Sequence, residues 1–172
     1  LEGFTITNGV AAEGAGITIL DAYPTILNNT ISSNTATAGN GGGILMRNYT
    51  PNIDVALIPR IAGNNISGNL AMTTFGGGGG LYVYSGYQFP ALENNQWENN
   101  RIEPLSAFLL FEGSSIFAIT GSDNDETLSI KNESLNVPEW TGSVSSPSAI
   151  VSKGVNLDID ASNFQIHYSN QR

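Results

Sequence analysis

Carboxylates are the side chains of this sequence best suited to chemistry, and three of them lie in one short run. Asp123, Asp125 and Glu126 flank Asn124, and carboxylate and amide oxygens are the ligands that Ca²⁺ prefers. The run lacks the glycine and the distal glutamate that an EF-hand loop requires. We therefore expect a solvated acidic turn, with a calcium site as the alternative and with no other cofactor.

A second pair of carboxylates, Asp158 and Asp160, lies two residues apart within a predicted strand. Because strand side chains alternate, both should point away from the core that their apolar neighbours enter. Paired carboxylates can hydrolyse glycosidic bonds, but such a site also needs a cleft and cations, for which Lys153 is the candidate. His167, the only histidine, has no serine or cysteine motif beside it. We expect these groups to be surface residues.

Asparagines in Asn-x-Ser/Thr sequences are candidate glycosylation sites. They include Asn28, Asn48 and Asn132. Asn48 borders an insertion that starts at Thr50-Pro51, so it is predicted to be the best exposed of the three. Whether any of them carries sugar depends on the host's machinery.

Composition and charge limit the classes of protein to consider. The 172 residues suffice for one core, and we predict a single domain, 1–172, that is a portion of, or a subunit in, a larger assembly. Only 12% of residues are charged and the formal net charge is −9, which excludes binding to nucleic acid and to anionic lipid. No apolar run is long enough for a transmembrane segment, and the absence of cysteine excludes disulfides.

Internal repeats position all of these residues. One motif reads apolar-x-Asn/Gly-x-x-apolar, with three near-identical copies and two weaker ones at 26–31, 61–66, 92–97, 130–135 and 159–164. A second motif, small residues followed by an alternating strand, precedes each copy, at 14–19, 41–46, 78–83, 106–110 and 148–152. The alternation with period 2 and the abundant glycine exclude helical repeats of similar length.

The repeats predict an all-β fold, a right-handed single-stranded parallel β-helix (a solenoid) of about five or six coils. Ile17, Ile44 and Leu81 should point inward and stack about 4.8 Å apart along the axis, with Phe108 and Leu110 in the next coil. Two columns of stacked amides should satisfy turn backbone from coil to coil. The first column is predicted to contain Asn29, Asn64 and Asn95, and the second Asn34, Asn69 and Asn100.

The outward positions of the same strands are unusually apolar. Two columns are predicted there: Thr18, Leu45, Tyr82, Leu109 and Val151, and beside them Leu20, Arg47, Tyr84, Phe111 and Lys153. Three interpretations are open. Insertions at 48–59 or 138–147 cover the apolar residues, or the residues form an interface with a partner, or their aromatic rings stack on polysaccharide.

The tetrapeptides resemble the repeats of polymorphic outer-membrane proteins, which are defined by GGAI and FxxN sequences. Residues 42–44 and 79–81 approximate the first tetrapeptide, and 31–34, 66–69 and 97–100 approximate the second. The resemblance covers about residues 1–104 well. It departs from the pattern in the coils at Ala107 and Ala149, where the glycine pair is lost and the asparagine columns are predicted to end. It implies an exported surface protein, adhesive or structural, and brings no catalytic residues with it.

We therefore expect an extracellular or cell-surface protein with a structural or adhesive role, such as a stalk, passenger or filament subunit. Its expected partners are other copies of itself, head-to-tail or lateral, or cell-surface polysaccharide. The alternative is a polysaccharide lyase or hydrolase of the pectate-lyase-like type. Enzymes of that type use acidic residues for calcium and a basic residue for proton abstraction.

Overall fold

The computed structural model describes residues 1–50, 57–105, 113–120, 127–137, 148–153, 155–160 and 163–166. The described residues form strands and turns and contain no helix, and every strand pairing among them is parallel. The described part of the chain therefore offers no helix that could cross a membrane. The prediction of an all-β, parallel architecture is confirmed.

The strands form four sheets, which we name A to D. Sheet A contains β4 (Thr25–Leu27), β8 (Arg60–Ala62), β12 (Ala91–Glu93), β16 (Thr127–Lys131) and β19 (Asn156–Asp160). Sheet B contains β1 (Thr5–Thr7), β5 (Thr30–Ser32), β9 (Asn65–Ser67), β13 (Gln96–Glu98), β17 (Ser134–Val137) and β20 (Asn163–Ile166). Sheet C contains β2 (Val10–Ala11), β6 (Thr35–Ala36), β10 (Leu70–Thr73) and β14 (Arg101–Pro104). Sheet D contains β3 (Ile17–Leu20), β7 (Ile44–Asn48), β11 (Leu81–Ser85), β15 (Gly113–Thr120) and β18 (Ser148–Lys153).

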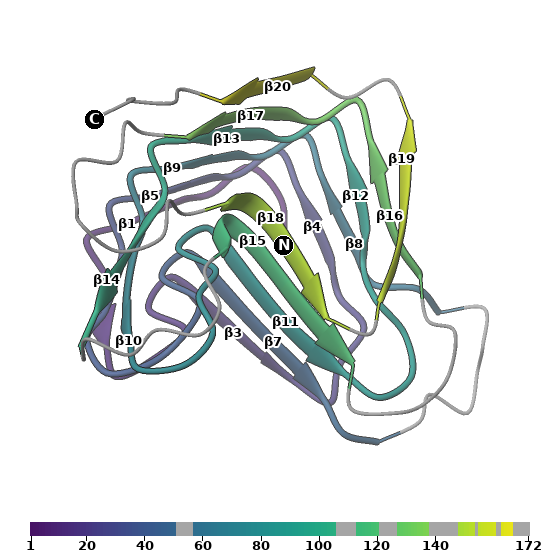
Figure 1. Ribbon diagram of the computed structural model, residues 1–172. Coiled ribbons are helices and arrows are strands. Elements are labelled where there is room, and N and C mark those ends of the chain that lie inside the picture. Colours follow the sequence, from purple (N-terminus) through teal and green to yellow (C-terminus); the bar gives the residue numbers. More distant parts are fainter. Residues whose placement is uncertain are drawn as a thin grey trace, which may run out of the picture.

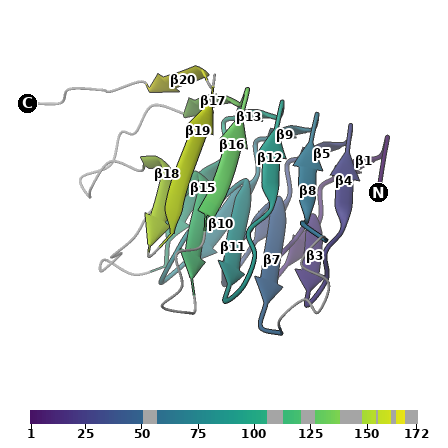
Figure 2. The same ribbon diagram turned by 90° about the vertical axis from the view of Figure 1, so that its right-hand side faces the viewer.

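From β1 to β17 the chain visits the sheets in a constant order: B, C, D, A, and then B again. We call one such passage a circuit. The next described strand after β17 is β18 of sheet D. Figure 1 looks along the stack of circuits, and Figure 2 shows sheet A from outside, with successive strands side by side from the N-terminal to the C-terminal circuits. Each strand thus pairs with the strand one circuit away in the sequence.

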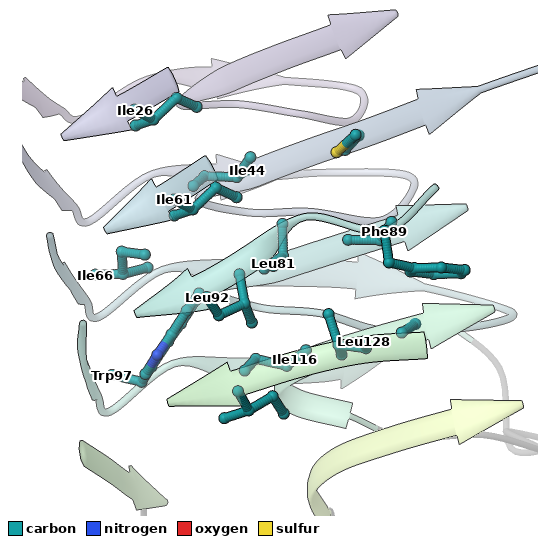
Figure 3. Close-up of a cluster of buried hydrophobic side chains, with 14 of the residues drawn as sticks. Ile26, Ile44, Ile61, Ile66, Leu81, Phe89, Leu92, Trp97, Ile116 and Leu128 are labelled. Carbon is teal, nitrogen blue, oxygen red and sulfur yellow. The ribbon is translucent and has the colours of Figure 1, made fainter. Parts of the chain in front are cut away.

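The register places equivalent residues of successive circuits over one another. In sheet D, Ile17 pairs with Ile44, Ile44 with Leu81, Leu81 with Ile116, and Ile116 with Ile150. The predicted stacking of Ile17, Ile44 and Leu81 is confirmed. The main core cluster combines such inward side chains from sheets A, B and D, and Figure 3 shows several of them, including Ile26, Ile44 and Ile61.

Residues in the left-handed region make the corners between sheets. Between sheets A and B the positive-φ residues are Gly3, Asn28, Gly63, Asn94 and Asn132. Between sheets B and C they are Asn8, Ser33, Gly68 and Asn99. Glycine and asparagine are the residues that adopt this conformation at least cost, so the repeated Asn/Gly positions of the sequence fix where each strand ends.

The prediction that 106–110 supplies the sheet D strand of its circuit is wrong. That strand is β15, in which Ile116 and Ala118 pair with Leu81 and Val83 and so occupy the stack positions predicted for Phe108 and Leu110. Residues 106–112 themselves lie outside the described part of the chain. The small residues Ser114-Ser115 stand directly before Ile116, where earlier circuits have a glycine pair.

Candidate functional site

The first amide column runs along the corner between sheets A and B. Asn64 Oδ1 accepts hydrogen bonds from the backbone N–H and the side-chain amide of Asn29, at 2.9 and 3.0 Å. Asn95 Oδ1 does the same for Asn64, at 2.9 Å each. The Asn64 and Asn95 amides also donate to the backbone carbonyls of Ile26 and Ile61 in the preceding circuit. Each side chain therefore satisfies backbone groups of the circuit before it.

The second column repeats this arrangement between sheets B and C. Asn69 Oδ1 accepts from the backbone N–H and the side-chain amide of Asn34, at 3.1 and 3.0 Å, and Asn100 Oδ1 accepts from those of Asn69, at 3.2 and 3.0 Å. All three asparagines are fully buried. The structure thus brings together all six asparagines that the sequence placed in the two columns.

Glycines before the sheet D strands pack directly against the second column. A Cβ added to Gly43 would lie 3.0 Å from Asn69 Nδ2, and a Cβ added to Gly16 would lie 3.0 Å from Asn34 Nδ2. A Cβ on Gly80 would lie 3.2 Å from Asn100 Cγ. The two sequence motifs occur together because their residues touch.

The first column does not end where the sequence suggested. Glu133 follows Asn95 in the next circuit, and its Oε1 accepts from the Asn95 backbone N–H at 3.2 Å and from the Asn95 amide at 2.9 Å. Its Oε2 accepts from the indole N–H of Trp97. Both Glu133 and Trp97 are 1% exposed. The asparagines of the first column end at Asn95, as predicted, but its hydrogen bonds continue into this circuit through Glu133, which the prediction missed.

The environment of Glu133 changes its protonation. Burial raises its pKa from 4.5 to about 7, and the hydrogen bonds from Trp97 and Asn95 oppose this only in part. The signal in the sequence was the position itself, because Asn132-Glu133 aligns with Asn94-Asn95 in the repeat. The equivalence was missed because a glutamate stands at 133 where the earlier repeats have an asparagine.

The outer side of sheet D is mostly covered within the chain. Leu45 is 1% exposed, and a Cβ on Gly14 would lie 2.9 Å from its Cβ, so the preceding turn packs on it. The ring of Tyr82 is also buried and stacks on Phe117, with centroids 5.5 Å apart and an angle of 2° between planes. Burial raises the pKa of Tyr82. Leu45 and Tyr82 are therefore not available as an interface or a stacking platform, and those two interpretations are wrong for them.

The other candidate residues of the two outward columns of sheet D are placed differently. Tyr84 is half-buried and its ring contacts that of Tyr49, at 5.3 Å between centroids, at the start of the insertion 48–59. Leu109 and Phe111 lie outside the described residues, and Phe117 and Ile119 pair with Tyr82 and Tyr84 instead. The interpretation that insertions cover the column holds in part, since turns of the chain supply the other part.

The candidate glycosylation sites differ in accessibility. Asn48 is fully buried in the corner after sheet D, where its Oδ1 accepts a hydrogen bond from the Ala22 backbone N–H at 3.2 Å. The prediction that Asn48 is the best exposed acceptor is wrong. Asn28 and Asn132 are exposed at corners between sheets A and B, with φ of 54° and 51°.

The most highly charged surface is the outer face of sheet A. We define the charged face as Arg60, Glu93, Lys131, Asp158 and Asp160, which belong to strands β8, β12, β16 and β19; these strands lie side by side in Figure 2. Glu93 pairs in register with Lys131, and Lys131 with Asp160. Arg60 Nη2 forms an ion pair with Glu93 Oε2 at 2.7 Å, whereas Lys131 forms no ion pair with a described residue. Asp158 and Asp160 are exposed, as predicted.

A shallow depression of about 330 Å³ lies on this face. Its polar lining comes from Gln88, Glu93, Thr127, Ser129 and Lys131. Its apolar lining comes from Ile58, Phe89, Pro90 and Ala91. The depression thus offers one ammonium, one carboxylate, two hydroxyls and an amide within a single hollow, and sequence reasoning missed it because the strands that build it are about 35 residues apart.

The described residues contain no group of three or more acidic or histidine side chains that could hold a metal ion. Asp123, Asp125 and Glu126, the candidate calcium ligands, lie outside these residues, as do His167 and the side chain of Lys153. The predicted calcium site stays a prediction.

Comparison with protein-family models, with curated proteins and with solved structures gives no match for this chain.

Proposed function

We propose that the chain is a right-handed single-stranded parallel β-helix of about five or six coils, and that it serves as a structural or adhesive scaffold on a cell surface or outside the cell. The constant sheet order and the uniform parallel register support this architecture. The tetrapeptides that resemble polymorphic outer-membrane protein repeats fall at equivalent places in successive circuits, which supports the surface role. A scaffold of this kind presents flat sides on which binding groups lie at a fixed spacing.

The binding surface in this proposal is the charged face of sheet A, and the ligand is a polysaccharide. The observation that carries it is the depression, where the Lys131 ammonium and the Thr127 and Ser129 hydroxyls line one hollow beside Glu93. Hydroxyls, a carboxylate and an ammonium together match the hydroxyl groups and ring oxygens of sugars. The depression is open and shallow, which suits a polymer that lies across the strands.

Affinity electrophoresis against neutral and acidic polysaccharides tests this proposal. We expect Lys131→Ala to weaken binding by about tenfold or more, because a charge-assisted hydrogen bond contributes roughly 1.5–3 kcal/mol. Arg101→Ala is the matched control, since Arg101 is an exposed cation on sheet C. Equal losses in both variants, or no binding by the unmodified protein, would contradict the proposal.

A polysaccharide lyase or hydrolase is the second candidate. Lys131 lies in register between Glu93 and Asp160, which places a potential base beside carboxylates on one face. A lyase produces an unsaturated sugar that absorbs ultraviolet light, so incubation with polygalacturonate or alginate, with and without Ca²⁺, tests this candidate. A rise in absorbance that Lys131→Ala abolishes would favour it over binding alone.

Association with other copies of the chain, head-to-tail or lateral, is the remaining part of the proposal. In the first circuit, Phe4, Val10 and Leu20 are exposed apolar side chains that such a contact would cover. Sedimentation at increasing protein concentration measures it directly. A monodisperse monomer at high concentration would contradict it.

A further inference from the structure

Glu133 is a buried acid at a position where the three preceding members of the column are neutral amides. Among the described residues, three donors converge on its two oxygens: the Asn95 backbone N–H, the Asn95 amide and the Trp97 indole N–H. It lies at the contact between the circuit of β13 and the circuit of β17, with the side chain 1% exposed. We call the contact between these two circuits the joint, and a change of charge on Glu133 acts directly on it.

The other charged groups nearby belong to the outer faces of the neighbouring strands. Strands β17 and β20 contain no ionisable residue. The charged residues of β12, β13, β16 and β19 are Glu93, Glu98, Lys131, Asp158 and Asp160. All five are partly or largely exposed, and of these Glu93 acts on Glu133 in the direction that favours its protonated form. Among the described residues, Glu133 is thus the ionisable group buried in this joint.

We propose that Glu133 is a pH-sensitive joint of the stack, which holds the C-terminal circuits more firmly when the carboxyl is protonated than when it is ionised. The protonated acid matches the neutral amides that precede it. The ionised form places a charge in the core, where desolvation is costly.

The direction of the pH dependence follows from linkage. The pKa of Glu133 is about 7 in the folded protein against an ordinary value of 4.5. Between these two values the folded protein holds a proton that the unfolded chain has released. The free energy of unfolding therefore falls as pH rises through this window, and the extra stability, complete below 4.5, is lost above about 7.

Tryptophan fluorescence reports on this carboxyl directly. The sequence has two tryptophans, so Trp140→Phe leaves Trp97, whose indole donates to Glu133, as the single emitter. We expect its emission to titrate with a midpoint near pH 7 and to lose this transition in the Glu133→Gln variant. A midpoint below about 5 would overturn the proposal. So would a transition that persists in Glu133→Gln, since it would then report another group such as His167.

Thermal unfolding gives an independent measurement. We expect the melting temperature of the unmodified protein to fall between pH 5 and pH 8 by at least about 4 °C more than that of Glu133→Gln. Glu98→Gln removes the same charge from an exposed position of β13 and should follow the unmodified protein. Because a glutamine amide would face the Trp97 N–H, Glu133→Asn, which restores the residue of the column, serves as a second neutral variant. Equal pH dependence in all four proteins would overturn the proposal.

Discussion

The circuits from β1 to β14 and those from β15 to β20 are held together by different interactions. In the first region, strands contain two to five residues and corners are closed by glycine, left-handed asparagine and the two amide columns. In the second, β15 contains eight residues, no described strand joins sheet C, and among the described residues only the first column continues, through Glu133. In the first region, side chains satisfy the backbone hydrogen-bonding groups of the corners. In the second region, longer strands provide more of the hydrogen bonding between circuits.

The two regions differ in both their glycines and their asparagines. A Cβ on Gly43 or on Gly80 would lie 2.6 or 2.7 Å from a backbone carbonyl oxygen of the next circuit, and 3.0 or 3.2 Å from Asn69 or Asn100. In the next circuit the equivalent position is Ser115, and the next place of the second column would fall by spacing on Pro138, which cannot extend an amide column. By sequence spacing, the residue at the asparagine position and the residue at the glycine position change together.

The largest effect should come from breaking a column in the first region. Asn64→Ala removes the acceptor of the buried Asn29 N–H and a donor to the Ile26 carbonyl. Because each unsatisfied buried group costs about 1–3 kcal/mol, we expect a loss of roughly 3 kcal/mol in the free energy of unfolding, measured by urea denaturation. Asn65→Ala, at the exposed neighbouring residue, is the control. Similar losses in the two variants would mean that the column does not stabilise the corners.

A smaller loss should follow from filling the space beside the column. A Cβ at Gly43 would lie 2.6 Å from the Gly80 carbonyl oxygen, so Gly43→Ala forces the backbone or Asn69 to move. We expect it to cost about 2 kcal/mol, by the same measurement. At Gly86 a Cβ would meet nothing within 4 Å, so Gly86→Ala should change little. An unchanged stability of Gly43→Ala would show that the space beside the column can accept a methyl group.

The smallest effect is expected in the second region and has the opposite sign. The hydroxyl of Ser115 is buried and has no hydrogen-bond partner in the described part of the chain. Removing an unsatisfied polar group is neutral or favourable, so Ser115→Ala should raise the free energy of unfolding by up to about 1 kcal/mol. A clear loss in a calorimetric scan would show instead that the hydroxyl stabilises β15.

The sequence allowed the fold and the columns to be predicted because both depend on repeated residues. Ile17, Ile44 and Leu81 recur after similar small residues, and the two asparagines of each pair recur at a constant distance from each other. The strand at 113–120 was not predicted, because the preceding run 106–110 is more apolar and is itself predicted as the strand. Serine in place of glycine weakened the correct signal.

The candidate site could not be predicted in the same way. Lys131 and Glu93 become neighbours only through the register of β12 and β16, whose separation depends on loops of unequal length. The burial of Tyr82 depends on Phe117 in another circuit and on turns of the chain. Such contacts between outward side chains leave no periodic trace in a single sequence.

The first amide column also has a direction. One donor of each amide points toward the C-terminal circuits, from Asn29 to Asn64 and from Asn64 to Asn95, while the Asn64 and Asn95 amides also donate to a carbonyl of the preceding circuit. Each oxygen only accepts, and it accepts from the circuit before it. A carboxyl oxygen can therefore follow the last amide, whereas reversing a single amide along the column would oppose two acceptors or two donors.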